Sequence, residues 1–255
     1  MTIVDVSHVD LIYQERHAET LAIQDLTFSV EEGEFVSIVG PSGCGKTSVL
    51  SLLTGLVPPT RGKVTLLGGA AEAARSVGYM LQRDALFPWR TVEENVLLGL
   101  EVRRLLTPAR RERAFELLER YGLGAFRGHF PRQLSGGMRQ KVALIRTLAL
   151  DPALLLLDEP FSSLDYQTRL LLGDEVFSIL SGEKKTAILV THDIAEAVSM
   201  SGRILVFSDR PAHVKRTFSV SLDPGETPLM RRKDVRFSGV FDAVWKELDN
   251  HDGND

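Results

Sequence analysis

Short apolar stretches near both ends of the chain predict β-strands. Residues 26–30 alternate between apolar and polar side chains, which is typical of an antiparallel strand with one buried face. Residues 153–157 are apolar throughout, as expected for a strand that is covered on both faces of a sheet. Further strands are expected at residues 4–11, 21–23, 35–39, 62–68, 76–81, 186–191, 204–207 and 213–220.

Helical periodicity replaces this pattern in the middle of the chain. Between residues 91 and 121 apolar side chains recur every three or four positions, and Pro108 stands where a second helix begins. Further helices are expected at residues 47–56 and 139–150, after Asp165, and in the polar tail. We therefore expect an α/β core (1–82 and 151–220), a helical insertion (83–150) that carries Leu134 to Met138, and a C-terminal extension (221–255).

A glycine-rich motif joins the strand at residues 35–39 to the helix after it. It fits the P-loop pattern G-x-x-x-x-G-K-[ST], in which backbone N–H groups and the helix N-terminus hold phosphate oxygens. We expect Lys46 to reach the β- and γ-phosphates and the Thr47 hydroxyl to bind Mg²⁺. The predicted nucleotide-binding residues of this motif are Gly40, Pro41, Ser42, Gly43, Cys44, Gly45, Lys46, Thr47 and Ser48.

Polar side chains follow two other buried strands. Asp158 and Glu159 come directly after residues 153–157, and ligands of open α/β sheets bind at the carboxyl ends of the strands. We expect Asp158 to share the Mg²⁺ with Thr47, and Glu159 to orient or deprotonate an attacking water. His192 follows the strand at 186–191 and is expected to donate a hydrogen bond to a γ-phosphate or to that water, although a lone histidine is more often structural.

Two weaker signals lie outside these strand ends. Ser135, Gly136 and Gly137 precede a predicted helix and offer backbone donors, but an ordinary serine N-cap explains the same residues equally well. Tyr13 is expected in a loop between the first strands, where its ring either stacks on an adenine or belongs to the core or to a sheet edge. Both alternatives stay open from the residues alone.

Composition narrows the class of protein. The chain has 255 residues, a net charge of −4 and 44% hydrophobic residues, which favours a globular protein over a general nucleic-acid binder. Its single cysteine and the lack of a long apolar run or a basic leader predict a soluble, cytosolic protein that reaches a membrane only through a partner. Because that cysteine, Cys44, lies in the P-loop, we expect its alkylation to inhibit nucleotide hydrolysis and bound nucleotide to protect it.

Taken in order, these motifs resemble those of the ATP-binding cassette (ABC) ATPases. Residues 40–47 resemble the Walker A motif, residues 154–159 the Walker B motif and residues 134–138 the signature motif of that family. Residues 162–165 resemble its D-loop, and Gln82 and His192 match its Q-loop and H-loop residues. The resemblance implies a P-loop NTPase (RecA-like) core with an antiparallel β subdomain and an inserted α-helical subdomain. It also implies ATP and Mg²⁺ as ligands, catalytic roles for Glu159, His192 and Gln82, Gln82 as a further metal ligand, and adenine stacking on Tyr13.

A finer resemblance is to the ATPase subunits of nitrate/sulfonate/taurine-type importers, through residues 86–92, 134–140 and 160–161. Lys141 and residues 145–147 depart from that branch but keep its charge and helical character. The resemblance implies a small anionic or polar solute and a head-to-tail homodimer, in which the Ser135-Gly136-Gly137 stretch of a second copy covers the ATP. It further implies a permease bound between Arg83 and Trp89, an indirectly acting solute-binding protein, and a peripheral position on the cytoplasmic face of the inner membrane.

Two alternative functions are compatible with the same motifs. One is a soluble ABC ATPase that acts on nucleic acid or ribosomes without a permease, which the acidic balance and the lack of long coiled coils or a second cassette disfavour. The other is a nucleotide-gated regulatory module with a partner-binding tail, which the short tail after Asp223 disfavours.

Overall fold

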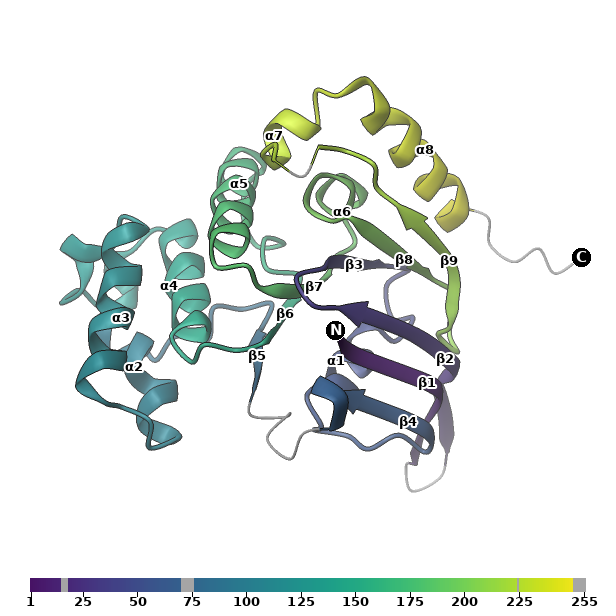
Figure 1. Cartoon of the computed structure of the whole chain (residues 1–255), viewed down its shortest axis with the longest axis horizontal. Helices are drawn as coiled ribbons and strands as arrows, with labels where there is room; N and C mark the ends of the chain where they lie inside the picture. Colours follow the sequence, from purple (N-terminus) through teal and green to yellow (C-terminus); the bar gives the residue numbers. More distant parts are fainter. Residues whose placement is uncertain (15–17, 70–75, 224, 250–255) are drawn as a thin grey trace, which may run out of the picture.

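An antiparallel sheet of three strands is built from the N-terminal part of the chain (Figure 1). The computed structural model describes residues 1–14, 18–69, 76–223 and 225–249. The sheet has the order β2-β1-β4, with β1 at Thr2–Gln14, β2 at Glu19–Glu31 and β4 at Arg61–Leu66. Val4 lies opposite Val30 on β2 and Leu66 on β4, so apolar side chains from all three strands meet on one face.

A second sheet of six strands forms the centre of the molecule, with the order β5-β6-β7-β3-β8-β9 (Figure 1). Neighbouring strands are parallel, except that β9 pairs antiparallel with β8. The strands are β3 (Phe35–Val39), β5 (Val77–Met80), β6 (Leu154–Asp158), β7 (Thr186–Val190), β8 (Arg203–Phe207) and β9 (Val214–Ser219). Because the parallel strands end at one edge, the residues after β3, β6, β7 and β8 gather there.

Both faces of the central sheet are covered, which explains the uninterrupted apolar run of β6. Leu154 and Leu156 pack in a core with the antiparallel sheet and helix α1 (Lys46–Leu53). Leu155 and Leu157 pack on the opposite side, with residues of α4 (Gly136–Leu148) and α5 (Tyr166–Gly182). Neighbouring side chains of a strand point to opposite faces, so each face of β6 needs its own apolar set.

Three helices form an arm at one side of the sheet (Figure 1). They are α2 (Val92–Val102), α3 (Pro108–Arg120) and α4, with single 3₁₀ turns at Gly124–Phe126 and Pro131–Gln133 and another, outside the arm, at Leu67–Gly69. Thr91 and Glu94 form a capping box at the start of α2, and Thr107 caps α3 with Pro108 in its first turn. Helix α4 begins at Gly136, three residues earlier than predicted, because Ser135 caps it.

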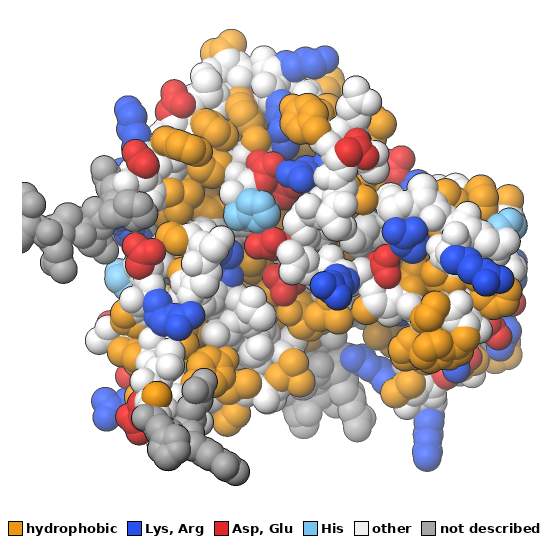
Figure 2. All heavy atoms as spheres, turned by 180° about the vertical axis from the view of Figure 1, so that it is seen from behind, with side chains coloured by type: hydrophobic (Ala, Val, Ile, Leu, Met, Phe, Trp, Pro, Cys, Tyr) orange, Lys and Arg blue, Asp and Glu red, His pale blue; other side chains and the backbone are white. Residues whose placement is uncertain are grey.

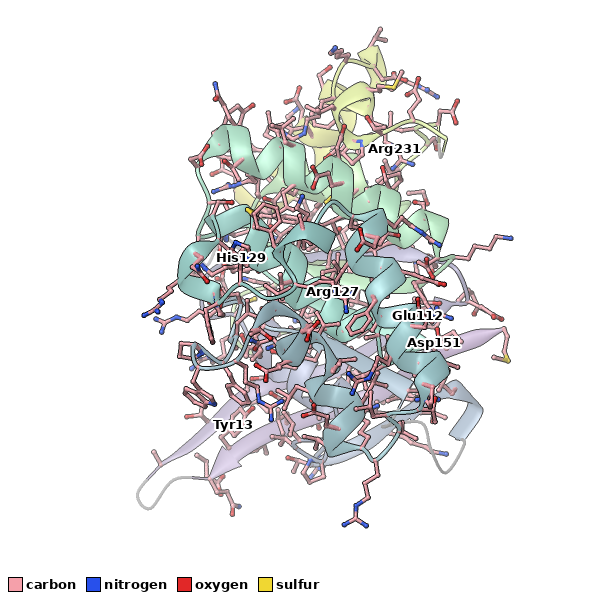
Figure 3. The ribbon with its side chains drawn as sticks, turned by 90° about the vertical axis from the view of Figure 1, so that its left-hand side faces the viewer. Tyr13, Glu112, Arg127, His129, Asp151 and Arg231 are labelled. Atoms are coloured by element: carbon pink, nitrogen blue, oxygen red, sulfur yellow. The ribbon has the colours of Figure 1, made fainter. Side chains whose placement is uncertain are left out.

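The C-terminal segment packs against the core through apolar side chains of its last helix, among them the buried Val244, and through one buried arginine. After α6 (Ile194–Met200) and β9, it forms α7 (Pro228–Arg231) and α8 (Val235–Asp249). Arg231 (labelled in Figure 3) is 5% exposed and donates to Ser199 O at 3.1 Å and Asp223 O at 2.9 Å. Its guanidinium lies 4.7 Å from the centre of the Phe177 ring. These contacts satisfy the buried charge and fasten the segment to α5 and α6. Among the described residues, no helix has the length and apolar character needed to cross a membrane.

Candidate functional site

The P-loop lies between the end of β3 and the start of α1, as predicted. Its backbone needs glycine at two positions, because Gly43 and Gly45 have φ angles of 78° and 127°. A Cβ atom on Gly45 would also lie 3.1 Å from Ala22 O and 3.2 Å from the Ala212 side chain. The strained turn brings backbone N–H groups of the loop and the first turn of α1 to one concave surface, which is the geometry that binds phosphate.

Lys46 is buried beneath this loop with its ammonium group held in place. The side chain is 7% exposed, and Nζ donates to Gly40 O at 2.7 Å and Pro41 O at 2.8 Å. An ammonium group has three donors, so one remains for a ligand in the pocket. The pocket has a volume of about 290 Å³ and is lined by Ser42, Gly43, Gly45, Lys46, Thr47, Ser48, Glu159 and Arg210.

The polar residues after β5, β6 and β7 converge on Glu159. Gln82 Nε2 donates to Glu159 Oε2 at 3.2 Å, and His192 Nδ1 lies 3.2 Å from the same oxygen. The backbone N–H of Glu159 donates to Val190 O at 2.8 Å, and its φ angle of 42° turns the chain sharply after β6. The three predicted catalytic residues therefore lie together at one site.

Asp158 sits at the last position of β6, next to Glu159. Burial raises the pKa of its carboxyl, and the neighbouring Glu159 raises that pKa further, whereas a hydrogen bond that Tyr79 donates to Oδ2 at 2.9 Å lowers it. Loss of hydration on burial raises the free energy of an ionised carboxylate, and a cation bound next to the carboxylate lowers that free energy again. Asp158 is thus poised to accept a positive charge.

Tyr13 lies in strand β1, so the predicted loop position is wrong. It pairs with Thr20 across the antiparallel sheet, and its hydroxyl donates to Ser48 Oγ at 3.2 Å. The irregular pairing of β1 around Val9 and Leu11 breaks the alternation from which the end of the strand would be predicted. The hydrogen bond nevertheless places the ring beside the first turn of α1, on the far side of the molecule from Arg231 in Figure 3.

Cys44 belongs to the core, so the expectation of an accessible thiol is wrong. Its side chain is 2% exposed, and a Cβ atom added to Gly40 would lie 3.0 Å from both the Cys44 sulfur and the Phe207 side chain. Burial also raises the pKa of the thiol. The side chain of Cys44 therefore packs beneath the loop, and its backbone N–H donates to Pro41 O at 3.3 Å.

The second predicted set of phosphate donors lies on another part of the chain. Ser135 caps α4 in the helical arm, and its Oγ accepts from Met138 N at 3.2 Å. Cβ atoms added to Gly136 and Gly137 would approach Leu164 and Thr168 to 3.1 and 3.2 Å, so these glycines allow α4 to pack closely on the start of α5. None of the three lines the P-loop pocket of its own chain.

Comparison with known proteins decides the family. The profile described as ABC transporter matches residues 23–162, more than half of the chain. The chain belongs to the ABC transporter family. It is 45% identical, over 98% of its length and 97% of the relative's, to the uncharacterized ABC transporter ATP-binding protein YtlC of Bacillus subtilis. It is 39% identical, over 95% and 94% of the two lengths, to the taurine import ATP-binding protein TauB of Rhizobium johnstonii.

Solved structures of ABC cassettes share the fold. A dimeric structure of the ATP-binding cassette MJ0796 in a post-hydrolysis state, bound to ADP and Pi, matches with a TM-score of 0.73 and 30% identity. The matched region covers 86% of this chain and 100% of the MJ0796 chain. The predicted P-loop NTPase fold and the ATPase activity are thereby confirmed, and this chain is the ATP-binding subunit of a transporter.

Arg210 is a pocket residue of this ABC ATPase that the sequence analysis missed. It follows β8, whose carboxyl end lies at the same sheet edge as those of β3, β6 and β7, and its side chain lines the P-loop pocket. The sequence held a signal, because a charged residue comes three positions after the predicted strand at 204–207. The strand-end rule that selected Asp158 and His192 applies equally to this position.

The donors at and around the pocket fit ATP and Mg²⁺: Thr47 lines the pocket, Asp158 precedes the pocket residue Glu159, and Gln82 contacts Glu159. Thr47 offers a hydroxyl, Asp158 a carboxylate and Gln82 an amide oxygen, and hard oxygen donors of this kind suit Mg²⁺. Among the described residues, no group of three histidine, cysteine or acidic side chains is able to hold a metal alone.

Proposed function

We propose that this ABC ATPase powers the import of a small anionic or polar solute through a separate permease. The observation that carries the proposal is the division of the phosphate-binding groups: the P-loop, Glu159 and His192 share one site, while Ser135 lies in the arm. A site divided in this way suits an ATPase in which two copies of the chain close around ATP. Relatives named as taurine import ATP-binding proteins support the class of solute.

Hydrolysis requires an activated water and a stabilised γ-phosphate. Glu159 is the base that orients and deprotonates the water, and His192, beside the same carboxylate, donates a hydrogen bond toward the γ-phosphate. Gln82 contacts both Glu159 and Ser162, the latter at 3.3 Å, so it links this water site to the segment that leads into the arm. Lys46 neutralises the phosphates from beneath.

Mg²⁺ completes the proposed ATP site. Thr47, Asp158 and Gln82 are the residues that would hold it, and the ion would supply positive charge to the phosphate oxygens. This chain's own contribution is to keep these three oxygens beside the P-loop.

The proposed working form is a head-to-tail homodimer. In it, Ser135, Gly136 and Gly137 at the start of α4 face the phosphates bound by the P-loop of the other copy, where the helix N-terminus favours negative charge. The solved structures of MJ0796, of which the second matches with a TM-score of 0.72 and 31% identity, are dimeric and support a dimer of this chain. Closure excludes water and strengthens every charge interaction in the site.

The proposed permease contact lies on residues 83–89, at the start of the helical arm. Phe87 and Trp89 stack there with ring centres 5.1 Å apart, and Trp89 is 71% exposed. Apolar side chains gather on the outer face of the arm (Figure 2). We propose that residues 83–150 transmit closure of the core (1–82 and 151–220) to a permease at the cytoplasmic face of the membrane. A solute-binding protein would act on the other side of the membrane, and residues 221–255 form a C-terminal extension.

Substitution of Glu159 tests the proposed ATP hydrolysis and ATP-dependent dimerisation. Glu159→Gln is expected to lower ATP turnover roughly 100- to 10,000-fold while ATP binding persists, because the amide cannot take the proton of the water. Bound but unhydrolysed ATP should also hold two copies together, which sedimentation velocity with and without ATP measures. The matched control, Glu112→Gln on the outer surface of α3 (Figure 3), should hydrolyse ATP normally. Near-normal turnover by the Glu159 variant, or a monomer in ATP, contradicts the proposal.

Uptake by cells tests the import function. A strain that lacks this chain should lose uptake of radiolabelled taurine or a similar small sulfonate, and the wild-type chain should restore it. The Glu159→Gln chain should not restore uptake, although it is expressed and folded. Normal sulfonate uptake without the chain would contradict the proposed class of solute.

A further inference from the structure

We propose that Arg210 binds the phosphate chain of ATP, as a second cation beside Lys46. The inference rests on the nucleotide site of this ABC ATPase and adds a residue from the turn between β8 and β9. Three features of the described residues support it: the turn is anchored, it packs against the P-loop, and the Arg210 guanidinium lines the pocket.

The turn that carries Arg210 is fixed to strand β2. Ala212 N donates to Ala22 O at 2.9 Å, and Gln24 N donates to Ala212 O at 3.1 Å, so the turn adds a short parallel bridge to the edge of the antiparallel sheet. Within the turn, Ser208 Oγ donates to Pro211 O at 3.1 Å and accepts from His213 N at 3.0 Å. An arginine on such a turn has little backbone freedom to lose when it binds a ligand.

The same turn packs directly against the P-loop backbone. The side chains of Phe207 and Ala212 flank the loop closely. A Cβ atom added to Gly40 would lie 3.0 Å from the Phe207 side chain, and one added to Gly45 would lie 3.2 Å from the Ala212 side chain. Both glycines of the motif therefore leave room for this turn as well as for phosphate. The position of Arg210 relative to the loop is set by packing on both of its sides.

The guanidinium of Arg210 has donors to spare. Within the described part of the chain it makes one hydrogen bond, from a terminal nitrogen to Gly43 O at 2.9 Å, and forms no ion pair. A guanidinium has five N–H donors in a planar fork that matches phosphate oxygens. Arg210 thus lines the pocket as an exposed cation that is held at one terminal nitrogen, and most of its donors have no partner among the described residues.

A purely structural function of Arg210 makes a different prediction. If its only function were to hold the loop through Gly43 O, a neutral donor of similar reach would serve as well, and all nucleotides would be affected alike. A phosphate-binding function instead depends on charge, and its effect grows with the number of phosphates. Arg210→Gln keeps a donor and removes the charge, whereas Arg210→Lys keeps the charge.

Nucleotide affinity distinguishes these alternatives. We expect Arg210→Gln to weaken Mg²⁺-ATP binding roughly 10- to 100-fold, the usual effect of losing a charge-assisted hydrogen bond, and to weaken AMP binding much less. Arg210→Lys should recover most of the ATP affinity, and the unfolding temperature should be the same in all variants. Isothermal titration with ATP, ADP and AMP measures the affinities, with Arg216→Gln on β9 as the matched control because its side chain pairs with Glu247.

Two results would overturn the inference. One is an Arg210→Gln protein that binds ATP as tightly as the wild type. The other is an equal loss for ATP, ADP and AMP, which would indicate that Arg210 only shapes the loop. Lys46→Ala, measured in parallel, separates this outcome from failure of the nucleotide site itself, because that variant must lose ATP binding wherever Arg210 acts.

Discussion

Glu196 shows how one buried carboxyl supports the loop that carries His192. It lies in α6, is 5% exposed, and accepts a hydrogen bond from the Thr191 hydroxyl at 2.7 Å. Its pKa is raised to about 7: burial is the largest cause and the charge of Asp193 adds to the rise, whereas the hydrogen bond from Thr191 and the charges of Arg169 and Arg232 oppose it. Since Thr191 and Asp193 flank His192, this cluster holds the backbone on both sides of the histidine.

The raised pKa of Glu196 predicts a pH-dependent stability. Between pH 4.5 and 7 the folded protein binds a proton at Glu196 that the unfolded chain releases, so the free energy of unfolding falls as the pH rises through this window. The loss is on the order of 3 kcal/mol once the pH exceeds the folded pKa. Glu196→Gln should flatten this part of the curve in urea unfolding at pH 5, 6, 7 and 8. An unchanged slope in the variant would contradict the assignment, and Glu112→Gln serves as the control.

Burial of Cys44 reverses the expectation for its chemistry. Because the thiol is covered and its pKa is raised, we expect maleimide to modify the native protein slowly, with or without nucleotide, and the urea-unfolded chain at once. Intact-mass spectrometry over time measures both rates. Rapid, complete labelling of the folded protein would show that the P-loop opens far more often than its packing against Phe207 suggests.

At the scale of elements, Asn95 ties α2 to the proposed permease contact. The residue is fully buried, its Oδ1 accepts from Phe87 N at 2.7 Å, and its Nδ2 donates to the carbonyl oxygens of Phe87, Arg90 and Thr91. One side chain thus contacts four backbone groups at the start of the helix, of which Thr91 O also accepts from Asn95 N at 2.9 Å. The exposed Trp89 is presented on a loop whose shape Asn95 determines.

Asn95→Ala is expected to destabilise the protein by about 2 kcal/mol, because it leaves buried backbone groups without partners. The isolated subunit should still hydrolyse ATP, since the P-loop pocket is untouched, but ATP hydrolysis should no longer couple to transport. Trp89→Ala is the matched variant: it should keep the stability in urea unfolding and lose coupling alone. An Asn95→Ala protein with full stability and full transport would contradict this function of the residue.

The sequence predicts elements well where a local signal is complete. Pro108 and the capping threonines mark the arm helices, and the apolar run of β6 predicts its burial on both faces. Helix α6 escapes prediction because seven residues give less than two full turns of periodicity. The sequence predicts a loop at Tyr13, whereas β1 extends past it with an irregular pairing that depends on the partner strands and not on β1 alone.

At the scale of the whole molecule, the site is predictable only in part. The P-loop, Asp158, Glu159 and His192 follow from a motif and from the rule that parallel strands end at one edge. The contact of Arg210 with Gly43 depends on packing of the β8–β9 turn against β2, which no local pattern encodes. The position of Ser135, away from its own P-loop, likewise follows from where the arm leaves the core.

The central claim is that Ser135 of one copy completes the P-loop of another, and crosslinking between copies tests it directly. One chain carries Ser135→Cys and the other Ser42→Cys, each in a Cys44→Ala, Glu159→Gln background so that no native thiol remains and ATP persists. A short bismaleimide should join the two chains when ATP is present and not without nucleotide, and a control chain with Ser238→Cys on α8 should remain unlinked. Crosslinking that is equally strong without ATP would contradict the account, and so would the absence of crosslinking when ATP is present.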